Sequence, residues 1–225
     1  LLGTLVEVKK RQAVSGVDIN LEQAWKTYGN GNHDTIVAMI DTGIDYTHED
    51  LKDTLWVNTD EIPGNGIDDD GNGYVDDVYG WNFYNNNNQI FTGEEDSHGT
   101  HGAGTISAGT GNGIGIAGVV PGNRVRVMAL KALGGTDGGG STAAVIKAIR
   151  YAEDNGAVIC NLSLTSTVDD KALYEAMKNS SMLFVVATGN GNPKTGKGVD
   201  TDAIPFYPAA YDLDNIISVA NLSID

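Results

Sequence analysis

Five short apolar runs alternate with segments of helical periodicity, and this alternation constrains the fold more than any other feature of the sequence. The runs show little polar alternation, which is typical of strands in a parallel sheet covered on both faces. They lie at residues 36–40, 125–130, 157–164, 183–187 and 216–220. Strands that alternate with helices predict an α/β fold, a three-layer doubly wound domain with a mostly parallel central sheet.

Capping residues precede three of the intervening segments. Asn20, Ser141 or Thr142, and Asp169 each stand before apolar residues spaced three or four apart, so we expect a helix to begin at each place. Neither an internal repeat nor a dividing linker is visible in the sequence. We therefore expect a single domain over residues 1–225.

Composition excludes several classes of function. The net charge is −16 and the sequence pI is about 4.4, so no basic surface is available to neutralise the phosphates of a nucleic acid. No stretch reaches the roughly 18 consecutive apolar residues of a membrane span. Cys160 is the one cysteine, which excludes a disulfide within the chain, and its apolar neighbours predict a buried thiol.

Three motifs contain residues suited to catalysis. Asp41, in Asp-Thr-Gly, follows the first predicted strand, where α/β sheets collect ligands and catalytic groups. His98 lies in Ser-His-Gly-Thr-His-Gly, and Asn190 lies in Thr-Gly-Asn after the fourth apolar run. Each has an ordinary alternative: a strand-end carboxylate for Asp41, an Asn-Gly turn for Asn190, and a metal pair for His98 with His101. The metal pair lacks the intervening glutamate of a zinc-protease helix.

Together these motifs resemble those of the subtilase family of serine proteases. The order Asp-Thr-Gly, then His-Gly-Thr-His-Gly, then Asn-Leu-Ser-Leu at 161–164, then Thr-Gly-Asn carries the resemblance, which begins near residue 12. It implies that Asp41 orients His98, that His98 transfers the protons, and that Asn190 donates to the oxyanion. The implied protein is a secreted serine endopeptidase whose leader is not part of this sequence.

The resemblance also implies the two walls of a substrate cleft. Ser163-Leu164-Thr165 resembles the strand edge that pairs with the substrate backbone, and Gly138-Gly139-Gly140 resembles the opposite wall. An extended peptide between two such edges is recognised through main-chain hydrogen bonds. The expected substrates are therefore proteins or peptides.

The family's nucleophilic serine has no match in this sequence. It belongs to a Gly-Thr-Ser segment about 65 residues after the oxyanion asparagine, whereas 35 residues follow Asn190 and Gly-Thr-Ser does not occur. We expect either a nicked protein with the serine on a second fragment, or truncation; this chain alone is then inactive. The alternative from another class is a non-catalytic, calcium-stabilised pseudoprotease or binding module.

Acidic residues are concentrated in one part of the chain. Between Asp41 and Asp96 lie 15 of the 30 acidic residues, and Lys52 is the sole Lys or Arg there. One interpretation is a solvated surface. Cation binding is the interpretation we favour, because clustered carboxylates repel one another unless a positive charge lies between them.

The densest acidic segment, residues 66–77, has the oxygen spacing of a calcium loop. With Asp68 counted as position 1, position 12 is Tyr79 rather than Glu, so we expect Asp76 or Asp77 to close the site. The alternative is a flexible acidic hairpin. The predicted Ca²⁺ ligands are Asp68, Asp70, Asn72, the carbonyl of Tyr74, and Asp77.

A second Ca²⁺ site is implied by the family resemblance alone. Residues 110–116 resemble the loop that interrupts the helix after the catalytic histidine in that family. The implied ligands are Gln12, Asp50, the side chain of Asn112, and the carbonyls of Thr110, Ile114 and Ile116.

A flavodoxin-like nucleotide-binding domain would share the sheet architecture. Its phosphate loop has the spacing Gly-x-Gly-x-x-Gly, which the glycines at 134–135 and 138–140 do not follow. That alternative also leaves the motif around His98 unexplained.

Overall fold

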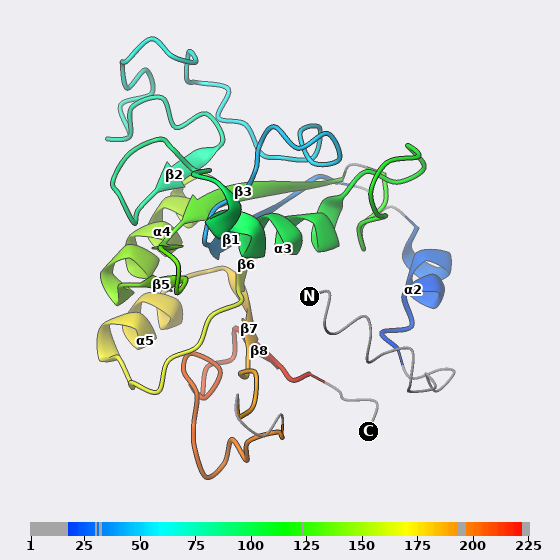
Figure 1. Cartoon of the computed structure of the whole chain (residues 1–225), viewed down its shortest axis with the longest axis vertical. Helices are drawn as coiled ribbons and strands as arrows, with labels where there is room; N and C mark the ends of the chain where they lie inside the picture. The colour runs from blue at the N-terminus through cyan, green and yellow to red at the C-terminus, as the bar shows by residue number, and fades with distance from the viewer. Residues whose placement is uncertain (1–17, 30, 32, 123, 193–196, 222–225) are drawn as a thin grey trace.

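The computed structural model describes residues 18–29, 31, 33–122, 124–192 and 197–221, so the predicted ligand Gln12 lies outside the described residues. Its centre is a six-stranded parallel sheet of order β2-β3-β1-β6-β7-β8 (Figure 1). The strands are β1 Thr35–Asp41, β2 Gly80–Asn82, β3 Val125–Lys131, β6 Ile159–Leu162, β7 Leu183–Ala187 and β8 Ile216–Val219. The predicted α/β class with a mostly parallel sheet is confirmed.

The first long strand lies in the middle of the sheet. β1 is hydrogen-bonded to β3 on one side and to β6 on the other, and its last residue, Asp41, is in register with Lys131 at the end of β3. Because all six strands run in the same direction, the ends of β1, β3 and β7 lie at one edge. This edge receives the loops in which an α/β sheet builds its site.

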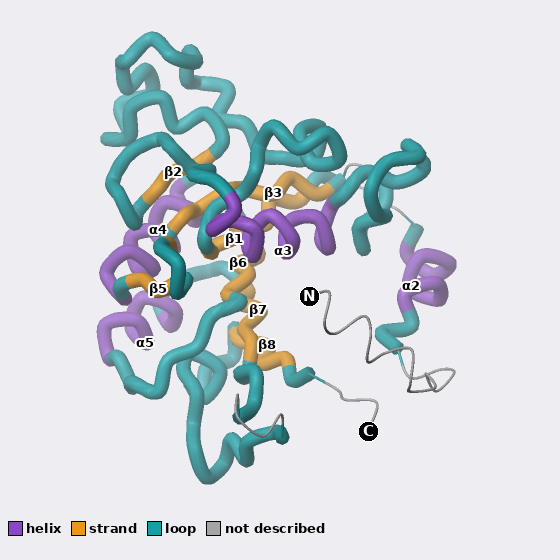
Figure 2. Tube along the Cα trace, viewed as in Figure 1, coloured by secondary structure: helices purple, strands orange, loops and turns teal. Residues whose placement is uncertain are grey.

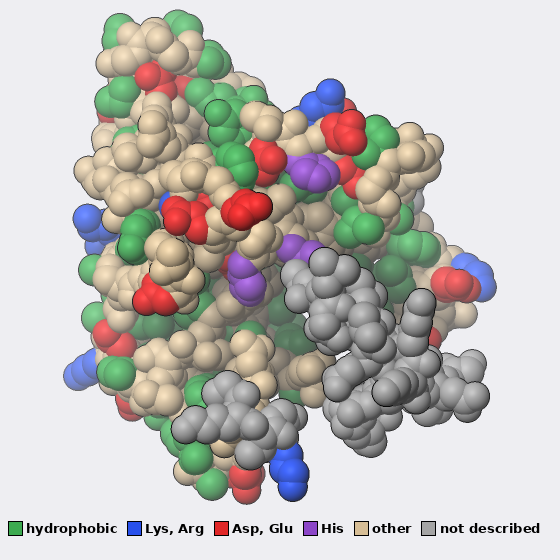
Figure 3. Space-filling view, viewed as in Figure 1, with side chains coloured by type: hydrophobic (Ala, Val, Ile, Leu, Met, Phe, Trp, Pro, Cys, Tyr) green, Lys and Arg blue, Asp and Glu red, His purple; other side chains and the backbone are tan. Residues whose placement is uncertain are grey.

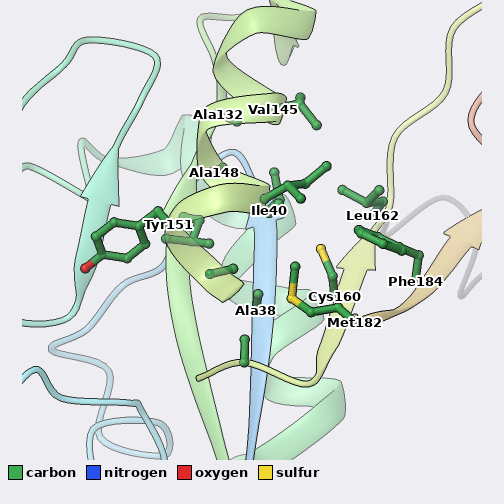
Figure 4. Close-up of a cluster of buried hydrophobic side chains, with 14 of the residues drawn as sticks. Ala38, Ile40, Ala132, Val145, Ala148, Tyr151, Cys160, Leu162, Met182 and Phe184 are labelled. Atoms are coloured by element: carbon green, nitrogen blue, oxygen red, sulfur yellow. The ribbon is translucent and has the colours of Figure 1, made fainter. Parts of the chain in front are cut away.

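Alternate residues of β1 pack into two separate cores, which explains its continuous apolar sequence. Ala38 and Ile40 belong to one core, which they share with α4 Thr142–Asp154 (Figure 4). Helix α5 Lys171–Lys178 adds Leu173 and Met177 to the same core. Val37 and Met39 belong to the other core, beneath α3 Ser97–Ser107. Helices therefore cover both faces of the central strands, as predicted for a doubly wound sheet.

The predicted helix starts are confirmed at two of three places. α2 spans Leu21–Tyr28, although the side chain of Asn20 makes no capping bond. Ser141 caps α4 by accepting from the backbone N–H of Ala144 at 3.2 Å. The predicted cap at Asp169 is wrong by one residue: Asp170 is the N-cap of α5. Its carboxylate accepts from two backbone N–H groups of the first turn, which Asp169 is one position too early to reach.

Short elements around the sheet carry the rest of the site. η1 Glu94–Asp96 leads directly into α3, and a two-stranded hairpin is formed by β4 Leu133–Gly134 and β5 Gly139–Gly140. The predicted strand 157–164 is shorter in the structure, since β6 ends at Leu162, where its pairing with β7 stops. Figure 2 shows the long segment between β1 and β2 almost entirely as loop. Among the described residues, no helix has the length and apolar character needed to cross a membrane.

Candidate active site

Asp41 and His98 meet at the carboxyl edge of the sheet. Asp41 ends β1 and is 1% exposed, while His98 is the second residue of α3 and its side chain is 60% exposed. The Nδ1 atom of His98 lies 2.7 Å from Oδ1 of Asp41, and the backbone N–H of Thr42 donates to the same oxygen at 2.7 Å. A buried carboxylate thus fixes one ring nitrogen, and the rest of the imidazole is accessible to solvent.

Small residues allow α3 to start directly on the turn after β1. A Cβ atom added to Gly99 would lie 2.2 Å from the carbonyl oxygen of Gly43, which no side chain could accept. The backbone N–H of Gly99 also donates to Oγ1 of Thr42 at 3.1 Å. This close approach of the helix to the turn brings His98 within reach of Asp41.

Asn190 lies in the same cleft as His98, although the two are 92 positions apart in the chain (98 and 190). It follows the end of β7, and its side chain is exposed. The preceding Gly189 has φ +113°, a backbone conformation that favours glycine and turns the chain sharply at this point. The structure therefore brings Asp41, His98 and Asn190 to one edge of the sheet.

The cleft has a volume of about 1090 Å³ and separates two segments. Gly138-Gly139-Gly140 lines it from the β4–β5 hairpin, and Ser163-Leu164-Thr165 lines it just beyond β6. Both are the segments expected as walls of a substrate cleft. Figure 3 shows histidine and acidic side chains at the surface of the face that it draws.

Three carboxylates from the acidic loop meet away from the cleft. Ligand oxygens of Glu61, Asp70 and Asp77 all lie within 4.8 Å of one another. The side-chain amide of Asn58 lies 2.9 Å from both Asp70 and Asp77, and that of Asn72 lies 3.0 Å from both. The predicted residues Asp70, Asn72 and Asp77 are thus brought together.

The sequence motif does not indicate two members of this cluster. Glu61 and Asn58 lie before the Asp-x-Asp-x-Asn run, so no spacing within the loop indicates them. Both are buried, and Glu61 organises the loop by accepting from the backbone N–H groups of Asp69, Asp70 and Asp76. A buried carboxylate that accepts from three loop N–H groups fixes the loop around itself.

The two remaining predicted ligands of this loop, Asp68 and Tyr74, are not among the three clustered carboxylates, and their side chains make contacts elsewhere. The carboxylate of Asp68 accepts from the backbone N–H groups of Asn72 and Gly73. The ring of Tyr74 packs edge to face against Tyr151, with centroids 5.0 Å apart. These contacts tie the turn to the core that contains α4.

Tyr151 connects the acidic cluster to the core. Its hydroxyl donates to Oδ2 of the fully buried Asp77 at 2.5 Å. Burial, and then this hydrogen bond, raise the pKa of Tyr151 far above its ordinary value, so the hydroxyl remains a donor. Burial and the charges of Asp154 and Asp77 also raise the pKa of Tyr74.

The second predicted metal site is organised around Asp50. Its Oδ1 accepts from the side-chain amide of Asn112 at 2.7 Å, and its Oδ2 accepts from the backbone N–H of Ile116 at 3.1 Å. These bonds, that of Asn112 above all, hold the pKa of Asp50 below its ordinary value. The loop that carries Thr110 and Ile114 is therefore wrapped against this carboxylate.

Known proteins resemble this chain in sequence and in fold. A family model described as the subtilase family matches residues 32–224. The subtilisin-like protease 1 of Plasmodium berghei (strain Anka) is 35% identical over 205 residues, which are 86% of this chain and 33% of that protein. The major intracellular serine protease of Bacillus subtilis (strain 168) is 36% identical over 191 residues, 84% of this chain and 51% of that protein.

Two further likenesses extend the comparison. Thermitase of Thermoactinomyces vulgaris is 32% identical over 207 residues, 90% of this chain and 60% of that protein. The crystal structure of a lanthipeptide protease matches with a TM-score of 0.56 and 24% identity, over 88% of this chain and 52% of that one, and this shows a shared fold. The chain spans about a third of the length of the Plasmodium protein and about half of the Bacillus one.

Proposed function

This chain belongs to the subtilase family, and from that premise we propose that it supplies the orienting carboxylate, the general acid–base histidine and the oxyanion donor of a serine endopeptidase. The observation that carries the proposal is the bond between His98 Nδ1 and Asp41 Oδ1, 2.7 Å long, at the edge of an open cleft. A buried carboxylate that holds one nitrogen of an exposed imidazole is the arrangement that peptide hydrolysis by a serine nucleophile requires.

Each of these residues has a defined task in the proposed reaction. Asp41 holds His98 in the tautomer that keeps Nε2 free to accept a proton, and it stabilises the imidazolium that forms. His98 takes the proton of the serine hydroxyl and returns it to the leaving amine. Asn190 donates to the oxyanion of the tetrahedral intermediate, a contact whose loss slows subtilisin itself by about 10²–10³-fold.

The serine belongs, in this proposal, to a segment outside residues 1–225. The sequence contains no Gly-Thr-Ser, and in the described part of the chain the partner of His98 is Asp41. Edge strand β8 supports the idea of a further packed segment, because Ile217 and Val219 are 49% and 50% exposed. Apolar side chains on a sheet face gain stability when another element covers them.

The cleft supports an extended peptide as the substrate. Its walls are a hairpin edge at Gly139–Gly140 and the chain at 163–165, both of which offer backbone groups on either side of a bound strand. Recognition through main-chain hydrogen bonds makes little demand on side-chain identity. Broad cleavage of proteins and peptides is therefore the proposed specificity.

Calcium is the metal that the acidic cluster fits best. The donors of Glu61, Asp70 and Asp77 are all oxygens, and Ca²⁺ is bound by six to eight oxygen ligands. The contacts described for these carboxylates are to neutral groups: amides, backbone N–H and the Tyr151 hydroxyl. A divalent cation would relieve the mutual repulsion of the three carboxylates.

Secretion is part of the same proposal. Extracellular calcium modules bind with dissociation constants of about 10⁻⁴–10⁻³ M, which only an extracellular calcium concentration would fill. A calcium affinity in that range would support a protein that acts outside the cell. Tight binding, in the range of intracellular calcium buffers, would remove this support.

The proposal is tested by labelling the purified, undenatured full-length protein with a fluorophosphonate probe and separating the products on a denaturing gel. We expect a labelled serine-bearing chain or fragment, because the probe reacts with an activated serine. His98→Ala should abolish labelling. His101→Ala, an exposed histidine three positions along the same helix, is the matched control and should retain it. Wild-type protein that is folded but unlabelled would favour the non-catalytic binding module instead.

A further inference from the structure

Lys131 and Asp96 form an ion pair inside the protein, and the proposed reaction does not use it. Both side chains are 0% exposed, and Nζ of Lys131 lies 2.5 Å from Oδ1 of Asp96. Burial of two charges is expensive, and well-packed apolar residues often replace such a pair without loss of stability. We therefore look for a role of this ion pair other than stabilising the fold.

The ammonium group of Lys131 joins the two segments that carry Asp41 and His98. It donates to the carbonyl oxygen of Thr42, the residue after Asp41, and to the carboxylate of Asp96, two residues before His98. Lys131 is itself anchored at the end of β3, in register with Asp41. Its third neighbour is the ring of Tyr84, whose centroid is 5.9 Å from Nζ.

Asp96 is held in place by contacts beyond the ion pair. Its Oδ2 accepts from the backbone N–H of Thr92 at 2.5 Å and from the hydroxyl of Thr92 at 3.0 Å. The turn after Asp41 packs directly on this carboxylate, because a Cβ atom on Gly43 would lie 2.9 Å from Cγ of Asp96. The same glycine has φ +123°, so the turn is shaped to admit the carboxylate.

We propose that Asp96 and Lys131 are positioning residues, which set the distance between Asp41 and His98 by clamping the turn after β1 to the start of α3. The inference rests on the proposed function for its consequence in catalysis. A fixed ammonium with directed N–H donors holds two carbonyl or carboxylate oxygens in one geometry, whereas the hydrophobic effect has no directional preference. The clamp acts through Asp41 and His98 and does not touch the substrate.

The test uses the full-length protein with the double substitution Asp96→Asn and Lys131→Met. Removal of both charges together avoids a lone buried charge, which would threaten folding in either single variant. The first readout is the deshielded proton NMR resonance of the His98 Nδ1–H group bonded to Asp41, assigned by its loss in His98→Ala. The second is kcat and KM for peptide hydrolysis.

The clamp predicts that the double variant loses or broadens this resonance and that kcat falls by about 10–100-fold, with KM within about twofold. Met177→Ala is the matched control for stability: this fully buried α5 residue belongs to the core and not to the cleft, so the resonance and kcat should persist. A folded double variant with the wild-type resonance and kcat would overturn the proposal. Wild-type protein without peptidase activity would refute the proposed function, while the resonance would still test the clamp.

Discussion

Gly99 follows His98 in sequence, and a side chain at this position would collide with the turn after β1. The nearest atoms to an added Cβ would be the Gly43 carbonyl oxygen at 2.2 Å and Oδ1 of Asp41 at 3.2 Å. The Gly43 carbonyl is part of the backbone, so it cannot rotate away from an added methyl group as the end of a flexible side chain could. The contact between the two proposed catalytic residues therefore depends on the smallest residue beside the histidine.

Gly99→Ala should lower kcat/KM at least about tenfold, because the methyl group must push α3 away from the turn and lengthen the Asp41–His98 bond. Gly104→Ala is the control in the same helix. Its added Cβ would meet nothing closer than Ile116 at 3.9 Å, and alanine favours helix, so activity should be retained. Steady-state kinetics with a peptide substrate make the comparison, and equal activity of the two variants would contradict it.

Sequence reasoning finds residues that belong to compact local motifs. Asp41, His98 and Asn190 stand in motifs whose order along the chain is specific, and the structure brings them to one edge. Glu61 and Lys131 stand in no such motif: one is an acid before a loop, and the other is a charged residue at the end of an apolar strand. Their contacts arise only when distant segments fold together.

Helix α5 shows how a single cap controls an element. Oδ1 of Asp170 accepts from the backbone N–H groups of Ala172 at 2.8 Å and Leu173 at 3.2 Å. The bond from Leu173 above all holds the pKa of Asp170 below its ordinary value. A lowered folded-state pKa means that the ionised cap stabilises the protein above the unfolded pKa, and that this contribution disappears as the pH falls through the folded value.

Asp170→Asn should therefore lose less stability on acidification than the wild type between about pH 5 and pH 2. Asparagine caps helices well but does not titrate, so the variant keeps the cap and removes its pH dependence. Urea unfolding followed by circular dichroism gives the free energy of unfolding at each pH. Asp169→Asn, the neighbouring substitution outside the cap, should follow the wild-type curve, and the idea fails if the two variants behave alike.

The predictability of the elements depends on their length and burial. β1 and β7 are continuous apolar runs, so the sequence predicts them to within a residue or two; β1 is buried on both faces over its last five residues, whereas β7 alternates buried and half-buried positions. β2, β4 and β5 have two or three residues each and lack any periodicity, so only tertiary pairing defines them. Asp169 and Asp170 both precede α5 and both are good N-cap residues, so the sequence alone does not decide which of them caps the helix.

Calcium should stabilise the whole molecule, because an ion that binds only the folded state shifts the folding equilibrium. A free calcium concentration about 100 times the dissociation constant adds about 2.7 kcal/mol to the free energy of unfolding. This corresponds to a rise in Tm of roughly 5–10 °C for a domain of this size. Differential scanning calorimetry of the full-length protein with calcium and with chelator measures the difference.

Glu61→Gln should reduce this calcium-dependent shift in Tm, because it removes one of the three clustered carboxylates. Glu22→Gln, which removes an exposed charge in the first turn of α2, is the control and should keep the full shift. A Tm that does not respond to the chelator in the wild type would refute both proposed calcium sites.

The central position of β1 has a consequence for the order of folding. Thr35 pairs with Val125, 90 residues later in the chain (35 and 125), and Val37 pairs with Ile159, 122 residues later (37 and 159). β1 therefore emerges from the ribosome long before either neighbour exists, and its apolar run stays uncovered during that interval. Topologies that close such long loops fold slowly and expose aggregation-prone surface meanwhile. Asp41 is thus synthesised early, but the strands that surround it are synthesised much later. The proposed activity therefore cannot arise before most of this sheet has assembled.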